Sequence, residues 1–241
     1  MFEKFEKLQI VTLAIILAIG LVAAAKIITG TFSKDTITVT GSAFQIVKSD
    51  SARLEFNITT RKADRASAYN EAQKQLPVVM KYLEEKGISK ENIELSSSHG
   101  YYNYKRTPNG NITNTVEDYV HSQPVIITSK DVDKIKELSI SLDSLISKGI
   151  EVNVMPPLYF YSEISNLKVK LLEDATIDAK ERAAAMLKAT NNKVGKIQSV
   201  RMGVFQITPA DSTNVSDYGI NDTSTIDKKV TSVANVVFRV K

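Results

Sequence analysis

The chain has 241 residues, 24% of them charged and 43% hydrophobic, which is the balance of a folded globular protein and excludes a wholly disordered one. Its net charge is only +4 and no basic run occurs, so we expect no nucleic-acid partner. The absence of cysteine excludes disulfides, thiolate metal sites and cysteine nucleophiles.

The first feature along the chain is an uncharged apolar run from Leu8 to Ala25. Its length falls within the roughly 17–25 residues that a membrane-crossing helix needs. We therefore predict that residues 1–30 form a single-pass anchor in the inner (cytoplasmic) membrane, with the C-terminal domain in the periplasm or outside. Ala23 and Ala25 also form an A-x-A site, so the alternative is a secreted or periplasmic protein after cleavage near Ala25.

Residues 31–241 are predicted to form one α+β domain. Its first strand is the β-branched segment 36–40, ended by Gly41. A second strand over 53–59 alternates apolar and polar residues, which indicates one buried face.

A helix is predicted over 63–86, with Gly87 as its C-terminal cap. Pro77 lies inside this helix and should kink it or split it in two. Its apolar stripe consists of Tyr69, Ala72, Leu76, Val79 and Leu83.

A hairpin follows, with strands over 92–104 and 116–128 and turn-forming residues over 105–114. A second helix spans 131–148, and Gly149 closes it. Its buried stripe is Val132, Ile135, Leu138, Leu142 and Leu145.

The second half begins with a strand over 150–160 that the pair Pro156-Pro157 interrupts, as at a sheet edge or bulge. A third helix spans 165–190. Strands over 195–207 and 230–240 end the domain. One face of the third helix carries Leu172, Ala175, Ala179, Ala183 and Met186.

The polar stretch 208–229 is interpreted as a solvated loop. Calcium binding is the alternative, but the spacing lacks the calcium-loop pattern and its closing Glu. The acidic residues concerned are Asp211, Asp217, Asp222 and Asp227.

These elements form two strand–helix–strand–strand units, at about 52–128 and 150–240, which suggests an internal duplication. The predicted fold class is therefore α+β, with mixed sheets covered by helices, plus one N-terminal transmembrane helix.

Only two histidines occur, His99 and His121, and both fall in the predicted hairpin. Glu117 or Asp118 would have to supply a third metal ligand, and no ligand spacing typical of a metal site is visible. We therefore predict no metal and no cofactor, and interpret both histidines as ordinary strand residues. Small-ligand or metal binding at the two histidines is the alternative function.

Aromatic residues cluster at two places, beside the turn of the hairpin and around the Pro pair. Because aromatics with a polar end are favoured at interfaces, they are our predicted interaction surface, with strand packing as the competing explanation. The surface consists of Tyr101, Tyr102, Tyr104, Tyr159, Phe160 and Tyr161.

Over about residues 36–240, the order and spacing of several segments resemble the SIMPL-domain family of bacteria, which includes periplasmic oxidative-stress-related proteins and an immunogenic outer-membrane-associated antigen. The segments are 37–41, 51–56, 82–89, 90–98, 101–104, 175–189 and 193–197. The chain departs from the family at Gly41-Ser-Ala-Phe, where relatives often carry a second glycine, and at Pro77.

The resemblance implies an exported α+β protein without accepted catalytic residues, some relatives of which self-associate into large assemblies. No phosphate loop, zinc-protease motif or nucleophile elbow occurs in the sequence. We therefore expect a non-enzymatic envelope protein that acts through self-assembly or partner binding, in envelope or oxidative-stress tolerance, and that forms a homo-oligomer. A hydrolase is the less favoured alternative.

Overall fold

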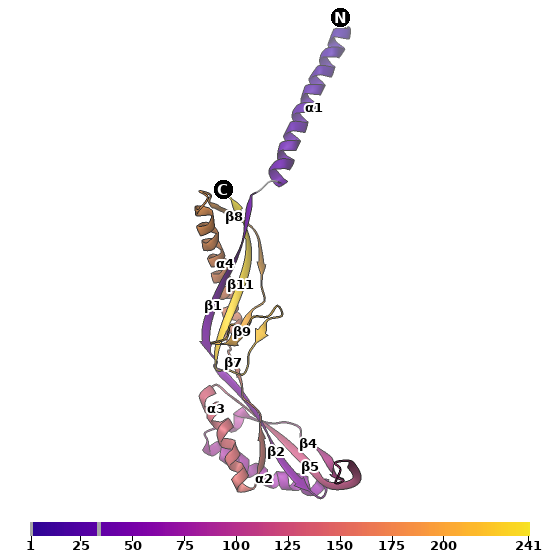
Figure 1. Ribbon diagram of the computed structural model, residues 1–241, viewed down its shortest axis with the longest axis vertical. Coiled ribbons are helices and arrows are strands. Elements are labelled where there is room, and N and C mark those ends of the chain that lie inside the picture. Colours follow the sequence, from indigo (N-terminus) through magenta and orange to yellow (C-terminus); the bar gives the residue numbers. More distant parts are fainter. Residues whose placement is uncertain (1, 33–34) are drawn as a thin grey trace. The chain divides into compact units, whose positions relative to one another are not determined.

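The computed structural model describes residues 2–32 and 35–241 (Figure 1). Helix α1 spans Phe2–Phe32, and the side chains of residues 2–8, 10 and 27–32 lie outside the described set. None of the helices, as far as their residues are described, has the length and apolar character needed to cross a membrane. The predicted anchor, residues 1–30, falls partly outside the described residues, and anchoring stays a prediction.

The other elements form two sheets with helices packed on them. Their bounds are β1 Thr36–Lys48, β2 Ser51–Lys62, α2 Arg65–Glu85, η1 Lys90–Asn92, β3 Ile93–Leu95, β4 His99–Arg106, β5 Ile112–Ser129, α3 Val132–Ser141, η2 Leu142–Lys148, β6 Glu151–Val154, β7 Leu158–Phe160, α4 Ile164–Lys188, β8 Val194–Met202, β9 Gln206–Pro209, β10 Ile220–Asn221 and β11 Asp227–Val240.

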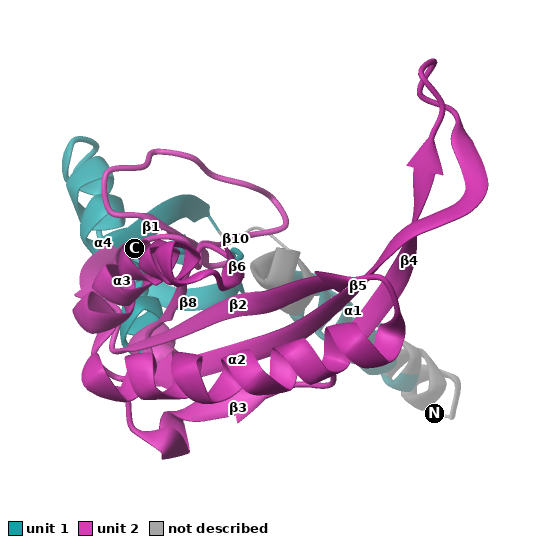
Figure 2. Ribbon diagram, turned by 90° about the horizontal axis from the view of Figure 1, so that it is seen from below, with its two compact units in different colours: residues 1–43, 170–204, 232–241 teal, residues 44–169, 205–231 magenta. Residues whose placement is uncertain are grey.

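The chain divides into two compact units (Figure 2). Unit 1 comprises residues 1–43, 170–204 and 232–241, and unit 2 comprises residues 44–169 and 205–231. Each unit is therefore assembled from segments far apart in the sequence.

The larger sheet has six strands in the order β3-β5-β2-β6, with β4 also pairing with β5 and β7 with β2. All of these pairs are antiparallel, so the prediction of a mixed sheet is wrong here. Only the other sheet has a parallel pair among those whose direction is described, β10 with β9.

Alternation of apolar residues on β2 builds the core of unit 2, as predicted. Leu54, Phe56 and Ile58 are completely buried, and the first two lie opposite Ile127 and Val125 on β5. Helices α2 and α3 contribute to the same core. The five predicted stripe residues of the second helix are all buried, although its last two turns form the 3₁₀ helix η2.

Helix α2 runs unbroken through Pro77, so of the two predicted effects the split is wrong, while a kink stays a prediction. Its N-cap is Asp64, whose carboxylate accepts a hydrogen bond from the backbone N–H of Ser67. Gly87 follows the helix with φ of +76°, as a C-terminal cap requires. The stripe begins at the buried Ala68, while Tyr69 is 47% exposed.

The predicted strand over 92–104 is two strands, β3 and β4. The break lies opposite Pro124 of β5, which has no N–H to continue the ladder. The predicted strand over 150–160 is likewise two strands, β6 and β7, separated at the Pro pair.

The second sheet has the order β1-β11-β9-β10, and β8 also pairs with β11. The segment 150–160 was predicted to belong with α4, β8 and β11, but its strands β6 and β7 pair with β2 in the larger sheet. The strand that joins β11 in the second sheet is β1. Alternation located most of the extended segments but not all of their breaks, and it carries no information on which sheet a strand joins.

Helix α4 packs on β1 and β11 in unit 1 through Ala175, Ala179 and Ala183, which are completely buried. At both ends of the helix the buried residue is the sequence neighbour of the one that was predicted, Leu171 in place of Leu172 and Leu187 in place of Met186. Leu171 and Leu187 are buried, whereas Met186 is 57% exposed.

Gly41 does not end the first strand, which continues to Lys48. A Cβ at Gly41 would lie only 2.1 Å from the backbone oxygen of Ala175 and 2.4 Å from the backbone nitrogen of Ala179. Asp178 of the same helix accepts a hydrogen bond of 2.8 Å from the backbone N–H of Ser42. Gly41 therefore allows α4 to contact the strand backbone directly.

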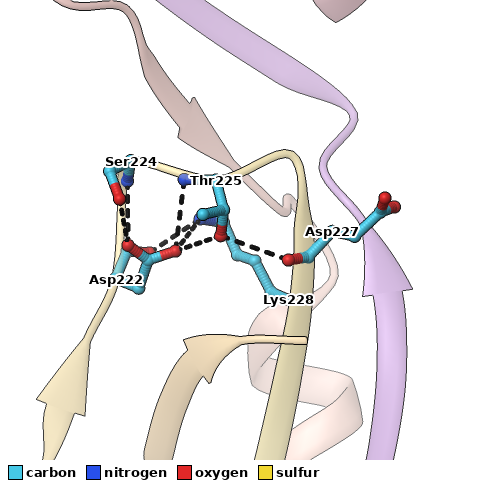
Figure 3. Close-up of polar contacts among 5 residues, drawn as sticks. All are labelled: Asp222, Ser224, Thr225, Asp227 and Lys228. Atoms are coloured by element: carbon cyan, nitrogen blue, oxygen red, sulfur yellow. Dashed lines mark hydrogen bonds and ion pairs between the residues drawn. The ribbon is translucent and has the colours of Figure 1, made fainter. Parts of the chain in front are cut away.

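The stretch 208–229 is folded and not simply a solvated loop. Asp222 forms an ion pair with Lys228 of β11, with an N–O distance of 3.2 Å and side chains only 9% and 3% exposed (Figure 3). The Asp222 carboxylate also accepts hydrogen bonds from the backbone N–H and hydroxyl groups of Ser224 and Thr225. Lys228 in turn donates to the backbone oxygen of Asp222 at 2.7 Å. The carboxylate is thus fully engaged by the protein.

A histidine- and tyrosine-lined candidate site

Unit 2 contains a cleft of about 450 Å³ where the start of α2 meets β4 and β5. We refer to it as the histidine cleft. Its lining residues are Arg65, Ala66 and Tyr69 from α2, Ser98, His99 and Gly100 at the start of β4, and Tyr119 and His121 from β5.

The antiparallel pairing of β4 with β5 brings the two histidines to this cleft. His121 lies opposite Gly100, and His99 lies opposite Ser122. The ring of Tyr69 packs edge-on against the imidazole of His121, with ring centres 5.6 Å apart. His121 is consequently only 5% exposed, whereas His99 is exposed.

Gly100 is required for this packing. A Cβ at this position would lie 2.6 Å from the hydroxyl of Tyr119 and 2.5 Å from the backbone oxygen of Val120. Sequence reasoning did not single out Gly100, although a glycine inside a strand is a known signal of close approach. It also missed Arg65, because the first residue of a helix carries no information about the strand ends beside it.

The electrostatic environment of the cleft is positive. Burial lowers the pKa of His121 below its usual value, and the nearby His99 and Arg65 lower it further. The imidazole of His121 is therefore neutral at pH 7. No Asp or Glu residue lines the cleft.

The cleft does not assemble the ligand set considered for a metal. Neither Glu117 nor Asp118 lines it, and among the described residues no three metal-ligating side chains come together. The hydroxyl of Ser98 forms no hydrogen bond with either histidine, which is the contact that a serine nucleophile needs from its base.

The predicted aromatic surface forms two separate groups. Tyr101, Tyr102 and Tyr104 lie on β4, whereas Tyr159 and Phe160 lie on β7. Strand β7 pairs with residues 51–53 of β2, but β4 aligns with the part of β5 that pairs with residues 59–62. The two groups therefore lie at opposite ends of β2.

The two groups also differ in exposure. The β4 tyrosines are 58%, 48% and 40% exposed in chain order. In the other group, Phe160 is exposed and Tyr161 is half-buried. Tyr159 belongs to the core, where burial, with a smaller contribution from Asp133, raises the pKa of its hydroxyl.

Strand β4 is an edge strand, and β5 is its only partner among the described strands. The β4–β5 hairpin projects beyond α2, at the upper right of Figure 2. Together with Ile112 and Val116 on β5, which are 66% and 39% exposed, the three tyrosines form a surface that we call the β4 arm.

Comparisons with known proteins support an assignment at the level of the family. Residues 37–238, most of the chain and including the histidine cleft and the β4 arm, match the family SIMPL, described as a protein of unknown function (DUF541). A search of curated proteins found no match. The resemblance seen in the sequence is thereby confirmed, and the chain belongs to the SIMPL family.

Proposed function

We propose that this SIMPL protein is an envelope protein, anchored by residues 1–30 with its folded part outside the cytoplasm, which acts by self-association through the β4 arm and not by catalysis. The observation that carries the proposal is the combination of three exposed tyrosines with an edge strand to which the described strands offer a partner on one side only. We place its physiological role in envelope or oxidative-stress tolerance.

A second copy of the same strand suits this surface. An edge strand presents unpaired backbone N–H and C=O groups, which readily pair with a strand of another chain. Two copies of β4 that run antiparallel about a two-fold axis would pair each other's free backbone N–H and C=O groups. Tyrosine supplies a large contact area at low cost in conformational entropy, and it is a common energetic centre of interfaces.

The test is the molar mass of the full chain in mild detergent, measured by size-exclusion chromatography with light scattering. We expect a protein mass above the monomer value of 26.6 kDa. The double variant Tyr101→Ser/Tyr104→Ser should weaken association by about tenfold or more, since buried interface tyrosines typically contribute over 1 kcal/mol each.

Tyr218→Ser is the matched control, because this tyrosine is 98% exposed and lies in the segment between β9 and β10. It should leave the mass unchanged. A wild-type chain that stays monomeric at about 100 µM, well above the Kd of a specific assembly, would refute self-association. Equal effects of the double variant and the control would refute the β4 arm as the interface.

A further inference from the structure

The histidine cleft gathers polar groups for which the described part of the protein provides no hydrogen-bond partner. Neither nitrogen of His121 has a hydrogen-bond partner among the described residues, and Nε2 is buried. The guanidinium of Arg65 makes no ion pair or hydrogen bond with those residues, and the hydroxyls of Tyr69 and Tyr119 make no hydrogen bond with them. An exposed arginine can be satisfied by water, but a buried imidazole that lines a cleft indicates a ligand contact.

The lining also determines which ligand would fit. It offers a guanidinium, two imidazoles and three hydroxyl groups, but no carboxylate. A complementary ligand must therefore supply acceptors and negative charge, and arginine binds oxyanions well because its planar fork donates two parallel hydrogen bonds. We propose that the histidine cleft binds a small organic oxyanion, a carboxylate or a phosphate ester, through Arg65, His99 and His121.

The size and the walls of the cleft favour an organic anion over an inorganic one. A volume of about 450 Å³ lies in the usual range for small-molecule sites. The rings of Tyr69 and Tyr119 provide aromatic walls beside the charged end. The ligand class is thus an anion with an apolar or aromatic body.

A metal ion is a poorer fit to the same residues. Two imidazoles make an incomplete ligand set, since stable sites usually have three or four protein ligands. The positive charge of Arg65 would also oppose a cation. Loss of Arg65 should therefore weaken the binding of an oxyanion and strengthen the binding of a metal ion.

The experiment uses the two histidines as reporters. In the full chain, in mild non-ionic detergent, histidine labelled with ¹³C at ring position Cε1 alone gives one NMR signal for each of the two histidines. Phenyl phosphate, benzoate and inorganic phosphate are titrated separately, with phenol as the neutral control. We expect saturable shifts of both signals with phenyl phosphate or benzoate, and which of the two binds more tightly distinguishes phosphate from carboxylate.

Arg65→Gln should lower the affinity for the tighter-binding probe by about tenfold, the usual effect of losing a charge-assisted hydrogen-bonded pair. Arg53→Gln, on β2 and paired with Glu55, is the matched control and should change the affinity less than twofold. The proposal is overturned by an absence of saturable shifts, by phenol binding as tightly as phenyl phosphate, or by equal losses in the two variants. Zn²⁺ binding that tightens in Arg65→Gln would overturn it in favour of a metal site.

Discussion

The Gly41→Ala substitution is expected to lower the unfolding free energy by about 3 kcal/mol, the upper part of the range for overpacking. Its Cβ would lie 2.1 Å from the oxygen of Ala175 and 2.4 Å from the nitrogen of Ala179. Both are backbone atoms of α4, so no side chain can rotate away. The helix would have to separate from the strand, with loss of packing against Val39 and Ala179.

The measurement is thermal and urea denaturation of the full chain, followed by circular dichroism. For a chain of this size the loss corresponds to a midpoint lower by about 6–12 °C. Gly203→Ala is the matched control, because its Cβ would meet Val233 no closer than 3.4 Å, an ordinary contact. The control should stay within about 0.5 kcal/mol of wild type. An equally stable Gly41→Ala variant would show that α4 does not lie directly on β1.

Lys228→Met is expected to cost about 3–5 kcal/mol, because it leaves the buried Asp222 carboxylate without its cation. The second substitution Asp222→Leu should restore part of this loss, since replacing both members of a buried pair by apolar residues is much less harmful. Lys81→Met removes an exposed pair with Glu85 and should change stability by less than about 0.5 kcal/mol. Denaturant unfolding of the four proteins, wild type included, measures these differences.

The same pair predicts a dependence of stability on pH. Burial alone raises the pKa of Asp222, but hydrogen bonds from Ser224, Thr225 and Lys228 outweigh it and hold the pKa well below its ordinary value of 3.8. A carboxyl group with a lowered pKa stabilises the folded state above its unfolded pKa and loses that effect as pH falls. The Asp222 contribution is therefore complete above about pH 5 and declines below about pH 4.

Asp222→Asn removes this titration. The difference in unfolding free energy between wild type and Asp222→Asn should shrink as the pH is lowered from 6 to 3. A difference independent of pH over that range would contradict the assigned ion pair.

Local patterns in the sequence predicted local structure well. The alternation at Leu54, Phe56 and Ile58 identified a half-buried strand, and Gly87 and Gly149 were correctly placed at the ends of helices with positive φ. These signals depend on only a few neighbouring residues, so tertiary packing alters them less than it alters the pairing of strands.

Partners of strands and helices could not be predicted in the same way. The segment 150–160 has the alternation of a strand, but nothing in it shows that it pairs with β2. Nor does it show that α4 packs on β1 instead. A displacement of one residue also separated the predicted Leu172 from the buried Leu171, because a helix face is broad enough to accept either position.

The candidate site was predicted in part. The hairpin pattern placed His99 and His121 near each other, and the structure brings both to one cleft. Arg65 and Tyr69 reach that cleft through the packing of α2, which only the folded chain reveals. Tyr159 looked like the other aromatics in the sequence, yet its alternate position on β7 turns it into the core.

The central strand of the second sheet has a consequence for biosynthesis. Strand β11 lies between β1 and the strands β8 and β9, and the Thr40 and Asn235 side chains that meet across β1 and β11 are 195 residues apart. The ribosome must therefore release nearly the whole polypeptide before this sheet can close, and such distant pairing is intrinsically slow. During that interval one edge of β1 lacks its partner strand, and such an edge favours pairing with strands of other chains.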